Sequence, residues 1–328
     1  MKRIAIVGAG GMARIRARAL LATGQVDICG VASRHRDTAQ AFAAEIGCAN
    51  SFDDYRQLMT MKPDALLVEV PHGVQDEITC WALEQGLHLL IGGVLATNSA
   101  NAQRICDLSR RHRLVVEAGF EARYSAAWIA AKAELDSGRL GDLVAIRSFA
   151  LWAGEPQTWY YRQQDSGGMP LTHMTYCFIN PVRWLVGNPQ AVSAFANRKL
   201  HTASGLVTEE TCIANLLFEG DVLASFTAGF VNPGHLPAWS VTLLGTKAAL
   251  DLFPVENGAG HLLLYRDNPG ERRTFESAGN PFAIQAAAFI ATLEGNNECR
   301  NRPEDTIDDI RIAEAIVASA QQRQTIRL

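Results

Sequence analysis

The segment that decides the fold is IAIVGAGGMA, residues 4–13. Residues 4–7 are apolar, which is typical of a buried parallel strand, and a G-x-G-x-x-A pattern follows at once. The first glycine permits a tight turn, the second lets the backbone approach a pyrophosphate, and the alanine lets the next helix pack closely. That helix, predicted over residues 12–23, presents its amino end to the anion. We therefore predict a dinucleotide site at Gly8, Ala9, Gly10, Gly11, Met12 and Ala13.

The end of the second strand, predicted over residues 26–32, indicates which dinucleotide binds. An acidic residue here would hold the ribose 2′-hydroxyl of NAD, but the chain has Ser33, Arg34 and Arg36 instead. A hydroxyl and two guanidinium groups suit a 2′-phosphate, so the sequence favours NADP, with NAD still possible. The alternative is that the arginines are simply solvated on the turn.

The remaining pattern divides the chain into two α/β domains. Strands and helices alternate up to residue 119, which predicts a Rossmann domain with a doubly wound parallel sheet over residues 1–119. Residues 120–328 contain a helix at 125–137 and two more near the end, at 282–293 and 307–322. They also contain long strand candidates separated by glycine and proline, which predicts an open, mainly antiparallel sheet. These candidates are residues 143–152, 191–197, 211–218, 222–229, 239–245 and 261–265.

Composition excludes several classes of protein. With 328 residues, 48% of them hydrophobic, and a net charge of −4, the chain is neither disordered nor shaped for nucleic acid. The seven cysteines form no C-x-x-C pair, which favours a reducing compartment and argues against a metal site. No secretory signal or membrane-spanning run is apparent. We expect a cytoplasmic protein whose partner is a small-molecule substrate, with no nucleic acid, membrane or metal.

From the glycine turn onward the chain resembles the Gfo/Idh/MocA family, the glucose–fructose oxidoreductase and inositol dehydrogenase group. The likeness is carried by residues 70–98, 119–124, 135–142, 166–171 and 244–247, and it extends almost end to end. The resemblance implies that a sugar, cyclitol or related polyol lies against the sheet of the second domain. Large open sheets of this kind often pair face to face, so we expect a homo-oligomer, a dimer or tetramer, through that sheet.

The chain departs from the family at its Glu-Lys-Pro motif, which reads Gly92-Gly93-Val94 here. In the family that lysine polarises or deprotonates the carbinol beside the nicotinamide, and its position falls on Gly93. The chain has five lysines, and none lies between Lys62 and Lys132. Three further family groups are replaced, the histidine after the proline turn by Gln75, and the Asp and His of the later Asp-x-Gly-x-His motif by Thr172 and Tyr176. We still expect the loops at the carboxyl ends of the strands to bind cofactor, through Pro71, His72, Gly92 and Gly93; for His72 we expect cofactor contact rather than catalysis.

Hydride transfer needs a group that moves a proton on the same carbinol. Our candidates are His173, Tyr176 and Tyr161. His173, Tyr176 and Asn180 share one face of an α-helix by their spacing. The alternative is that Tyr176 packs in the core and His173 caps a turn.

For substrate binding we select Trp159, Tyr160, Arg123 and Asn180, since sugar sites combine aromatic faces with polar edges. Alternatively, the aromatic residues only pack a loop against the sheet, and Arg123 forms an ion pair with an acidic neighbour on the surface. The sequence thus predicts an NAD(P)-dependent oxidoreductase acting on a sugar-like or other hydroxylated or keto small molecule. Two alternatives stay open: a redox-neutral enzyme of elimination, hydrolysis or epimerisation that holds its nicotinamide tightly, and a non-catalytic NAD(P)-binding accessory protein.

Overall fold

The computed structural model describes residues 1–232, 239–254, 260–266, 270–274 and 279–328, and it divides them into two compact units. Unit 1 comprises Met1–Phe120 and Phe282–Ile307, and unit 2 comprises Glu121–Pro281 and Asp308–Leu328. The first boundary lies one residue from the predicted one. The return of residues 282–307 to unit 1 differs from the predicted division, in which one domain took all of residues 120–328.

The helix α8 (Pro281–Leu293) explains this return. Its side chains Phe282, Phe289 and Ile290 are buried in the same core as Leu20, a residue of α1 (Gly11–Ala22). A helix that is apolar on several sides needs a core on more than one side, and the parallel domain provides it. Sequence periodicity shows that such a helix is buried, but not in which domain.

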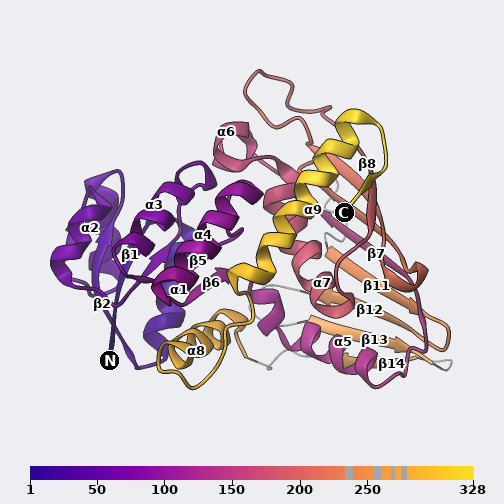
Figure 1. Ribbon diagram of the computed structural model, residues 1–328, viewed down its shortest axis with the longest axis horizontal. Helices are drawn as coiled ribbons and strands as arrows, with labels where there is room; N and C mark the ends of the chain where they lie inside the picture. Colours follow the sequence, from indigo (N-terminus) through magenta and orange to yellow (C-terminus); the bar gives the residue numbers. More distant parts are fainter. Residues whose placement is uncertain (233–238, 255–259, 267–269, 275–278) are drawn as a thin grey trace. The chain divides into compact units, whose positions relative to one another are not determined.

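Unit 1 is a parallel six-stranded sheet flanked by helices (Figure 1). The strand order is β3-β2-β1-β4-β5-β6, so the order reverses between β1 (Lys2–Val7) and β4 (Ala65–Val68). Ligands of such sheets bind at the carboxyl ends of the strands near this reversal. The other elements are β2 (Val26–Ala32), α2 (Arg36–Glu45), β3 (Ser51–Phe52), η1 (Tyr55–Met61), α3 (His72–Glu84), β5 (His88–Gly92), α4 (Ser99–His112) and β6 (Val116–Gly119).

Unit 2 is built on a nine-stranded sheet in the described part of the chain, with the order β14-β13-β12-β11-β7-β10-β9-β8-β15. Its neighbouring strands are antiparallel except for β7 and β10, which confirms the mainly antiparallel prediction. Three of its strands, β12, β14 and β15, were not predicted. The strands are β7 (Leu143–Leu151), β8 (Ala191–Asn197), β9 (Thr211–Leu217), β10 (Leu223–Gly229), β11 (Trp239–Gly245), β12 (Ala249–Pro254), β13 (Gly260–Tyr265), β14 (Glu271–Thr274) and β15 (Ile326–Arg327).

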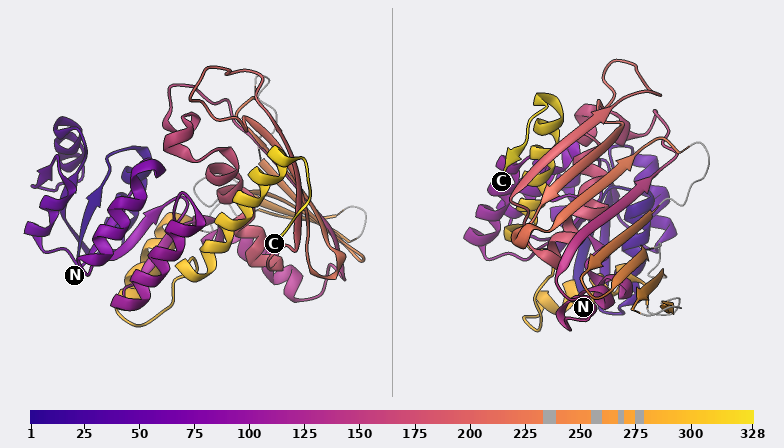
Figure 2. Two further views of the ribbon diagram at one scale, coloured as in Figure 1. Left: turned by 45° about the horizontal axis from the view of Figure 1, so that its top comes forward. Right: turned by 90° about the vertical axis from the view of Figure 1, so that its right-hand side faces the viewer.

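The two faces of this sheet differ (Figure 2). Helices α5 (Ala126–Asp136), α7 (Asn180–Val186) and α9 (Pro303–Gln322) lie on one face. In α9, the Ser319 hydroxyl accepts a hydrogen bond from the backbone N–H of Ala194 in β8. Within the described residues no helix covers the other face, where large apolar side chains are exposed: Phe195 by 63%, Ile213 by 45% and Leu223 by 59%.

None of the seven cysteines, all of which the structure describes, forms a disulfide bond, and all seven are buried. Among the described residues, no helix combines the length and apolarity that a membrane crossing requires.

Candidate active site

The glycine turn after β1 has the form that a dinucleotide needs. Gly8 has φ +109°, and a Cβ at this position would lie 1.9 Å from the carbonyl oxygen of Glu69, so only glycine fits. By contrast, a Cβ at Gly10 or Gly11 would meet no atom within 4 Å. Gly10 is the N-cap of α1 and provides no side-chain cap. The turn therefore combines open space with uncapped N–H groups at a helix amino end, which suits a pyrophosphate.

The end of β2 carries the two arginines that the sequence assigned to the cofactor. Arg34 and Arg36 are exposed, and neither guanidinium group forms an ion pair or hydrogen bond with any residue in the described part of the chain. Ser33, half-buried between them and the strand, donates its backbone N–H to Phe52 at 3.1 Å. In a Rossmann sheet the residues at the end of the second strand contact the adenosine ribose, and Ser33, Arg34 and Arg36 follow that strand here.

The carboxyl ends of β4 and β5 hold a buried ion pair that the sequence did not reveal. Glu69, directly after β4, lies 2.6 Å from Nε of Arg16 (oxygen Oε1), and the two side chains are 10% and 2% exposed. Burial raises the pKa of the Glu69 carboxyl, and the Arg16 guanidinium opposes that rise. Arg16 also donates to Gln285 at 2.6 Å and to the carbonyl of Gly119.

Gly92, the last residue of β5, is the neighbour that makes room for this pair. A Cβ on Gly92 would lie 2.1 Å from Oε2 of Glu69. The register pairs Val68 with Ile91, so residues 69 and 92 come next on the two strands. The Glu69 carboxylate therefore fills the space in which a side chain of residue 92 would begin.

Gly93 shows the same relation to His72. Its φ is +58°, and a Cβ there would lie 3.0 Å from Nε2 of His72. His72 is 5% exposed and is the first residue of α3, directly after Pro71. The four residues predicted for this edge, Pro71, His72, Gly92 and Gly93, thus lie together at the ends of neighbouring strands.

Unit 2 gathers the predicted aromatic residues into one cluster. The ring of His173 lies 4.4 Å from that of Trp152, 5.4 Å from that of Tyr160 and 4.8 Å from that of Phe230, measured between centroids. The Nδ1 atom of His173 is 2.9 Å from the hydroxyl of Thr172. His173 is half-buried, so the cluster presents a polar edge beside aromatic faces.

Two of the candidate tyrosines occupy different environments in or beside this cluster. Tyr161 is fully buried, its hydroxyl donates to the carbonyl of Phe230 at 3.3 Å, and burial raises its pKa. Such a hydroxyl stays protonated. Tyr176 is half-buried, and its ring lies 6.4 Å from that of Trp239. Trp159 contacts the cluster through Tyr160, at 6.1 Å.

The predicted common face of His173, Tyr176 and Asn180 is not observed. Residues Pro170–Ile179 form a π-helix, η4, in which the Asn180 N–H bonds to the Thr175 carbonyl five residues earlier. Because this turn is wider than that of an α-helix, the spacing that aligns residues 173 and 180 in an α-helix no longer does so. His173 and Tyr176 are half-buried, but Asn180 is fully buried.

Asn180 and Arg123 belong to a buried ionic group of unit 2. Arg123 donates to the Asn180 carbonyl at 3.1 Å, and the Asn180 amide donates to Asp309 at 2.7 Å. Arg183 forms the ion pair with the same carboxylate. Burial raises the pKa of Asp309 and the Arg183 guanidinium opposes the rise. Arg123 and Asn180, two of the four residues selected from the sequence for substrate binding, therefore lie in the interior of unit 2.

Comparison with known proteins identifies the fold and the family. Residues 2–120 match the family model described as the oxidoreductase family with an NAD-binding Rossmann fold, and residues 128–251 match the GFO/IDH/MocA C-terminal domain. The chain belongs to the Gfo/Idh/MocA family. It is an NAD(P)-dependent oxidoreductase of that family.

Relatives and solved structures cover nearly the whole chain. D-glucoside 3-dehydrogenase of Escherichia coli (strain K12) is 25% identical over 315 residues, which cover 89% of this chain and 88% of the relative. 1,5-Anhydro-D-fructose reductase of Ensifer adhaerens is 23% identical over 334 residues, which cover 100% and 99%. A structure of levoglucosan dehydrogenase in complex with NADH and levoglucosan has a TM-score of 0.89 at 19% identity and covers 99% of each chain, which shows a shared fold.

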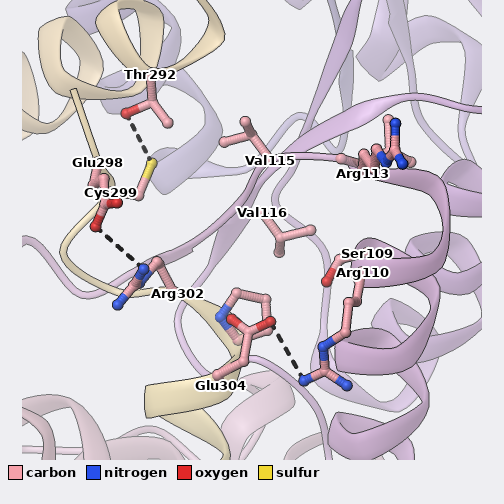
Figure 3. Close-up of a pocket in the computed structure, with 12 residues that line it drawn as sticks. Ser109, Arg110, Arg113, Val115, Val116, Thr292, Glu298, Cys299, Arg302 and Glu304 are labelled. Carbon is pink, nitrogen blue, oxygen red and sulfur yellow. Dashed lines mark hydrogen bonds and ion pairs between the residues drawn. The ribbon is translucent and has the colours of Figure 1, made fainter. Parts of the chain in front are cut away.

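A cavity of about 420 Å³ lies at the amino end of β6, on the side of the parallel sheet opposite to the glycine turn (Figure 3). It is lined by the last turn of α4, by Val115 and Val116 at the amino end of β6, and by the segment around Cys299. Among its charged side chains, Arg302 pairs with Glu298 of the same segment at 3.2 Å, and Arg110 pairs with Glu304 at 3.8 Å. Since the cofactor turn follows β1 at the carboxyl edge, this cavity is not the candidate site.

Sequence reasoning missed Glu69 and three aromatic residues of the cluster. Strand pairing brings the aromatics together: Leu151 pairs with Gly229, and Ala150 pairs with Trp239. Trp152 and Phe230 therefore follow paired strand ends beside Trp239. No single segment carries this signal, because the three residues are far apart in the chain.

Proposed function

We propose that this chain is an NADP-preferring dehydrogenase or reductase of a pyranose-type sugar or glycoside. The observation that carries the sugar assignment is the aromatic cluster of unit 2, defined by Trp152, Tyr160, His173, Phe230 and Trp239. Except for Phe230, which is buried, these rings are half-buried. They offer the C–H faces of a sugar ring an apolar surface and its hydroxyl groups a polar edge.

Within this cluster the polar atoms suit hydroxyl recognition. The His173 imidazole and the Tyr176 hydroxyl each accept and donate hydrogen bonds. We therefore assign both side chains to the binding of sugar hydroxyl groups. The buried Tyr161 hydroxyl donates to the backbone carbonyl of Phe230, so we assign Tyr161 to packing of the cluster and not to proton transfer.

The preference for NADP is supported by Arg34 and Arg36. Each charge-assisted hydrogen bond to a phosphate contributes about 1.5–3 kcal/mol, which NAD cannot recover since it has no 2′-phosphate. When bound, the nicotinamide accepts or supplies the hydride. The names of the relatives, which are sugar dehydrogenases and reductases, agree with this reaction class.

The test is nicotinamide absorbance measured with NADP⁺ or NAD⁺ against alkyl glucosides, anhydro sugars and cyclitols, with keto sugars in the reverse direction. We expect sugar-dependent turnover that is faster with NADP. Trp152→Ala should raise KM about 10-fold to 100-fold, the equivalent of about 1.4–2.7 kcal/mol. The matched control Trp81→Ala removes a half-buried tryptophan of α3 and should leave KM unchanged.

Two results would contradict the proposal. One is NADPH binding without any sugar-dependent change in absorbance over the whole panel. The other is product formation with no net change in cofactor redox state, which would favour the redox-neutral alternative.

A further inference from the structure

The oxidation of a carbinol needs a proton acceptor beside the nicotinamide, and no lysine lies between Lys62 and Lys132. The strand order indicates where a nicotinamide would bind. Ser33 and Arg34, our candidates for ribose binding, follow β2, so the adenosine half of a dinucleotide would lie on that side of β1. The nicotinamide half would then extend over the carboxyl ends of β4 and β5, beyond the reversal of strand order.

We propose that His72 is the residue that accepts and returns the carbinol proton, in the space that Gly93 leaves open. This inference rests on the proposed function and adds to it the identity of the proton-transfer group. A histidine is suited to this role because it exchanges a proton near neutral pH and because either ring nitrogen can act.

The first support is the position of the imidazole. The atoms within 4 Å of a Cβ on Gly93 are Nε2 and Cε1 of His72, at 3.0 and 3.8 Å. The reactive nitrogen is therefore the part of the ring that is nearest to the place where a side chain of residue 93 would start. Gly93 itself is half-buried, so the residue beside this edge of the imidazole keeps part of its surface exposed.

The second support is the parallel relation between Glu69 and Gly92. The carboxylate of Glu69 fills the space that a side chain of residue 92 would occupy. In the same way, Nε2 of His72 faces the space of a side chain of residue 93. Both side chains come from the segment 69–72 that follows the neighbouring strand β4. The segment after β4 thus places the carboxylate of Glu69 beside Gly92 and the imidazole of His72 beside Gly93.

The third support is the rigid attachment of the loop to α3. Gln75, one turn after His72, donates to the carbonyls of Val94 at 2.7 Å and Leu95 at 3.4 Å. The next residue, Asp76, accepts from the backbone N–H of Thr97 at 3.2 Å. These bonds fix the loop after Gly93 against the helix that carries the imidazole, which preorganises the distance between them.

Two other titratable groups of unit 1 near these strands, Glu69 and His88, do not face the Cβ position of Gly93. Glu69 is held in its ion pair by Arg16. His88 lies at the other end of β5, where its Nδ1 accepts from the N–H of Val115 at 2.9 Å. His72 is therefore the group that both lies next to Gly93 and has a side chain suited to proton transfer.

The O–H proton of the substrate carbinol moves to Nε2 of His72, and the hydrogen on the same carbon leaves with its electron pair for C4 of oxidised nicotinamide. A C=O bond forms, so the sugar is oxidised by two electrons and NADP⁺ is reduced to NADPH. The imidazolium then releases its proton to water, and the reverse sequence reduces a ketone.

The test compares His72→Gln and His72→Ala with the wild type and with His112→Gln, a control at the exposed end of α4. Three quantities are measured: the Kd of NADPH by fluorescence, and kcat and KM on the best sugar. We expect the two His72 variants to lose about 10²–10⁴-fold in kcat, with the Kd of NADPH within threefold of the wild type. The control should match the wild type. His173→Gln should change KM more than kcat.

Activity alone does not test the placement, so a second measurement uses the protein without ligands. Gly93→Ala would put a methyl group 3.0 Å from Nε2. Long-range ¹⁵N NMR of the imidazoles should then show a shift of the His72 signals and none for His112.

Each failure has a distinct meaning. A wild-type chain that binds NADPH but oxidises no sugar contradicts the proposed function, while the NMR result still decides the placement. Unchanged His72 signals in Gly93→Ala, a His72→Gln variant with kcat within threefold of the wild type, or a loss of NADPH binding parallel to the loss of kcat would each overturn the role of His72. If His173→Gln alone removes kcat, His173 is the proton-transfer group.

Discussion

The exchange of a carboxylate between residues 69 and 92 tests how the end of β5 is built. Glu69→Ala removes the partner of Arg16, whose side chain is 2% exposed. Gly92→Glu adds a second carboxylate to the same space, with its Cβ 2.1 Å from Oε2 of Glu69. The double variant Glu69→Ala/Gly92→Glu contains one carboxylate again, now carried by β5.

The magnitudes follow from burial. Breaking a buried ion pair by removal of one partner costs about 3–5 kcal/mol, because the remaining charge is uncompensated. Overpacking the space next to Glu69 costs about 1–3 kcal/mol, and repulsion between two buried carboxylates adds to it. If the changes were independent, the double variant would lose about 4–8 kcal/mol, a large part of the stability of a typical protein. With the carboxylate restored opposite Arg16, we expect a loss of about 2 kcal/mol or less.

The assay is urea unfolding at neutral pH, followed by tryptophan fluorescence and by circular dichroism. An exposed pair serves as the control: Glu77→Ala removes the partner of Arg56, at 2.9 Å, and should cost less than about 1 kcal/mol. A double variant as unstable as the sum of the single variants would refute the reasoning, because it would show that the two positions do not share one space.

Three further outcomes are expected. The variant Arg34→Ala/Arg36→Ala should raise the Kd of NADPH at least about tenfold and leave that of NADH within threefold, as measured by fluorescence titration; an equal loss for both cofactors would contradict the 2′-phosphate assignment. Because an exposed apolar sheet face of this kind marks an interface, we expect a homo-oligomer through it, and Phe195→Lys/Ile213→Lys should give monomers in analytical ultracentrifugation, whereas a monomeric wild type would remove the premise. Burial of Glu210 opposes its ionisation, but hydrogen bonds from the backbone of residues 199–201 hold its pKa below the ordinary value of 4.5. Its contribution to stability is therefore complete above pH 4.5 and is lost as the pH falls through the lowered pKa, so Glu210→Gln should flatten the decline of Tm in that acid range.

The parts of the fold that could be predicted from the sequence are those determined by the pattern of residues within one short segment. Val26–Ala32, Ala191–Asn197 and Trp239–Gly245 form strands over the predicted residues. Each is a run of mostly apolar or alternating residues between turn-forming residues, so the period and the boundaries agree. The glycine turn at Gly8 and Gly10 was equally readable, because its spacing encodes a steric requirement.

The parts that could not be predicted depend on contacts between distant segments. The return of Phe282 and Phe289 to unit 1 is decided by which core accepts them. The π-helix at Pro170–Ile179 is set by its surroundings, and an α-helical period therefore placed Asn180 on the wrong face. The aromatic cluster likewise needed the pairing of β7 with β10 and β11, which no single segment contains.

The pair Gly92-Gly93 shows why a missing motif in a sequence is weak evidence for missing chemistry. A motif comparison considers only the residue at each position of one strand, and at both positions that residue is glycine. The structure also shows which atoms of other segments occupy the space beside the strand. Because Val68 pairs with Ile91, the chain can fill the space at residue 92 with Glu69, and the segment then continues to His72 beside Gly93. Under the proposed role of His72, the two glycines therefore make room for the carboxylate and the base, since a side chain at residue 92 would collide with Glu69 and one at residue 93 would crowd His72.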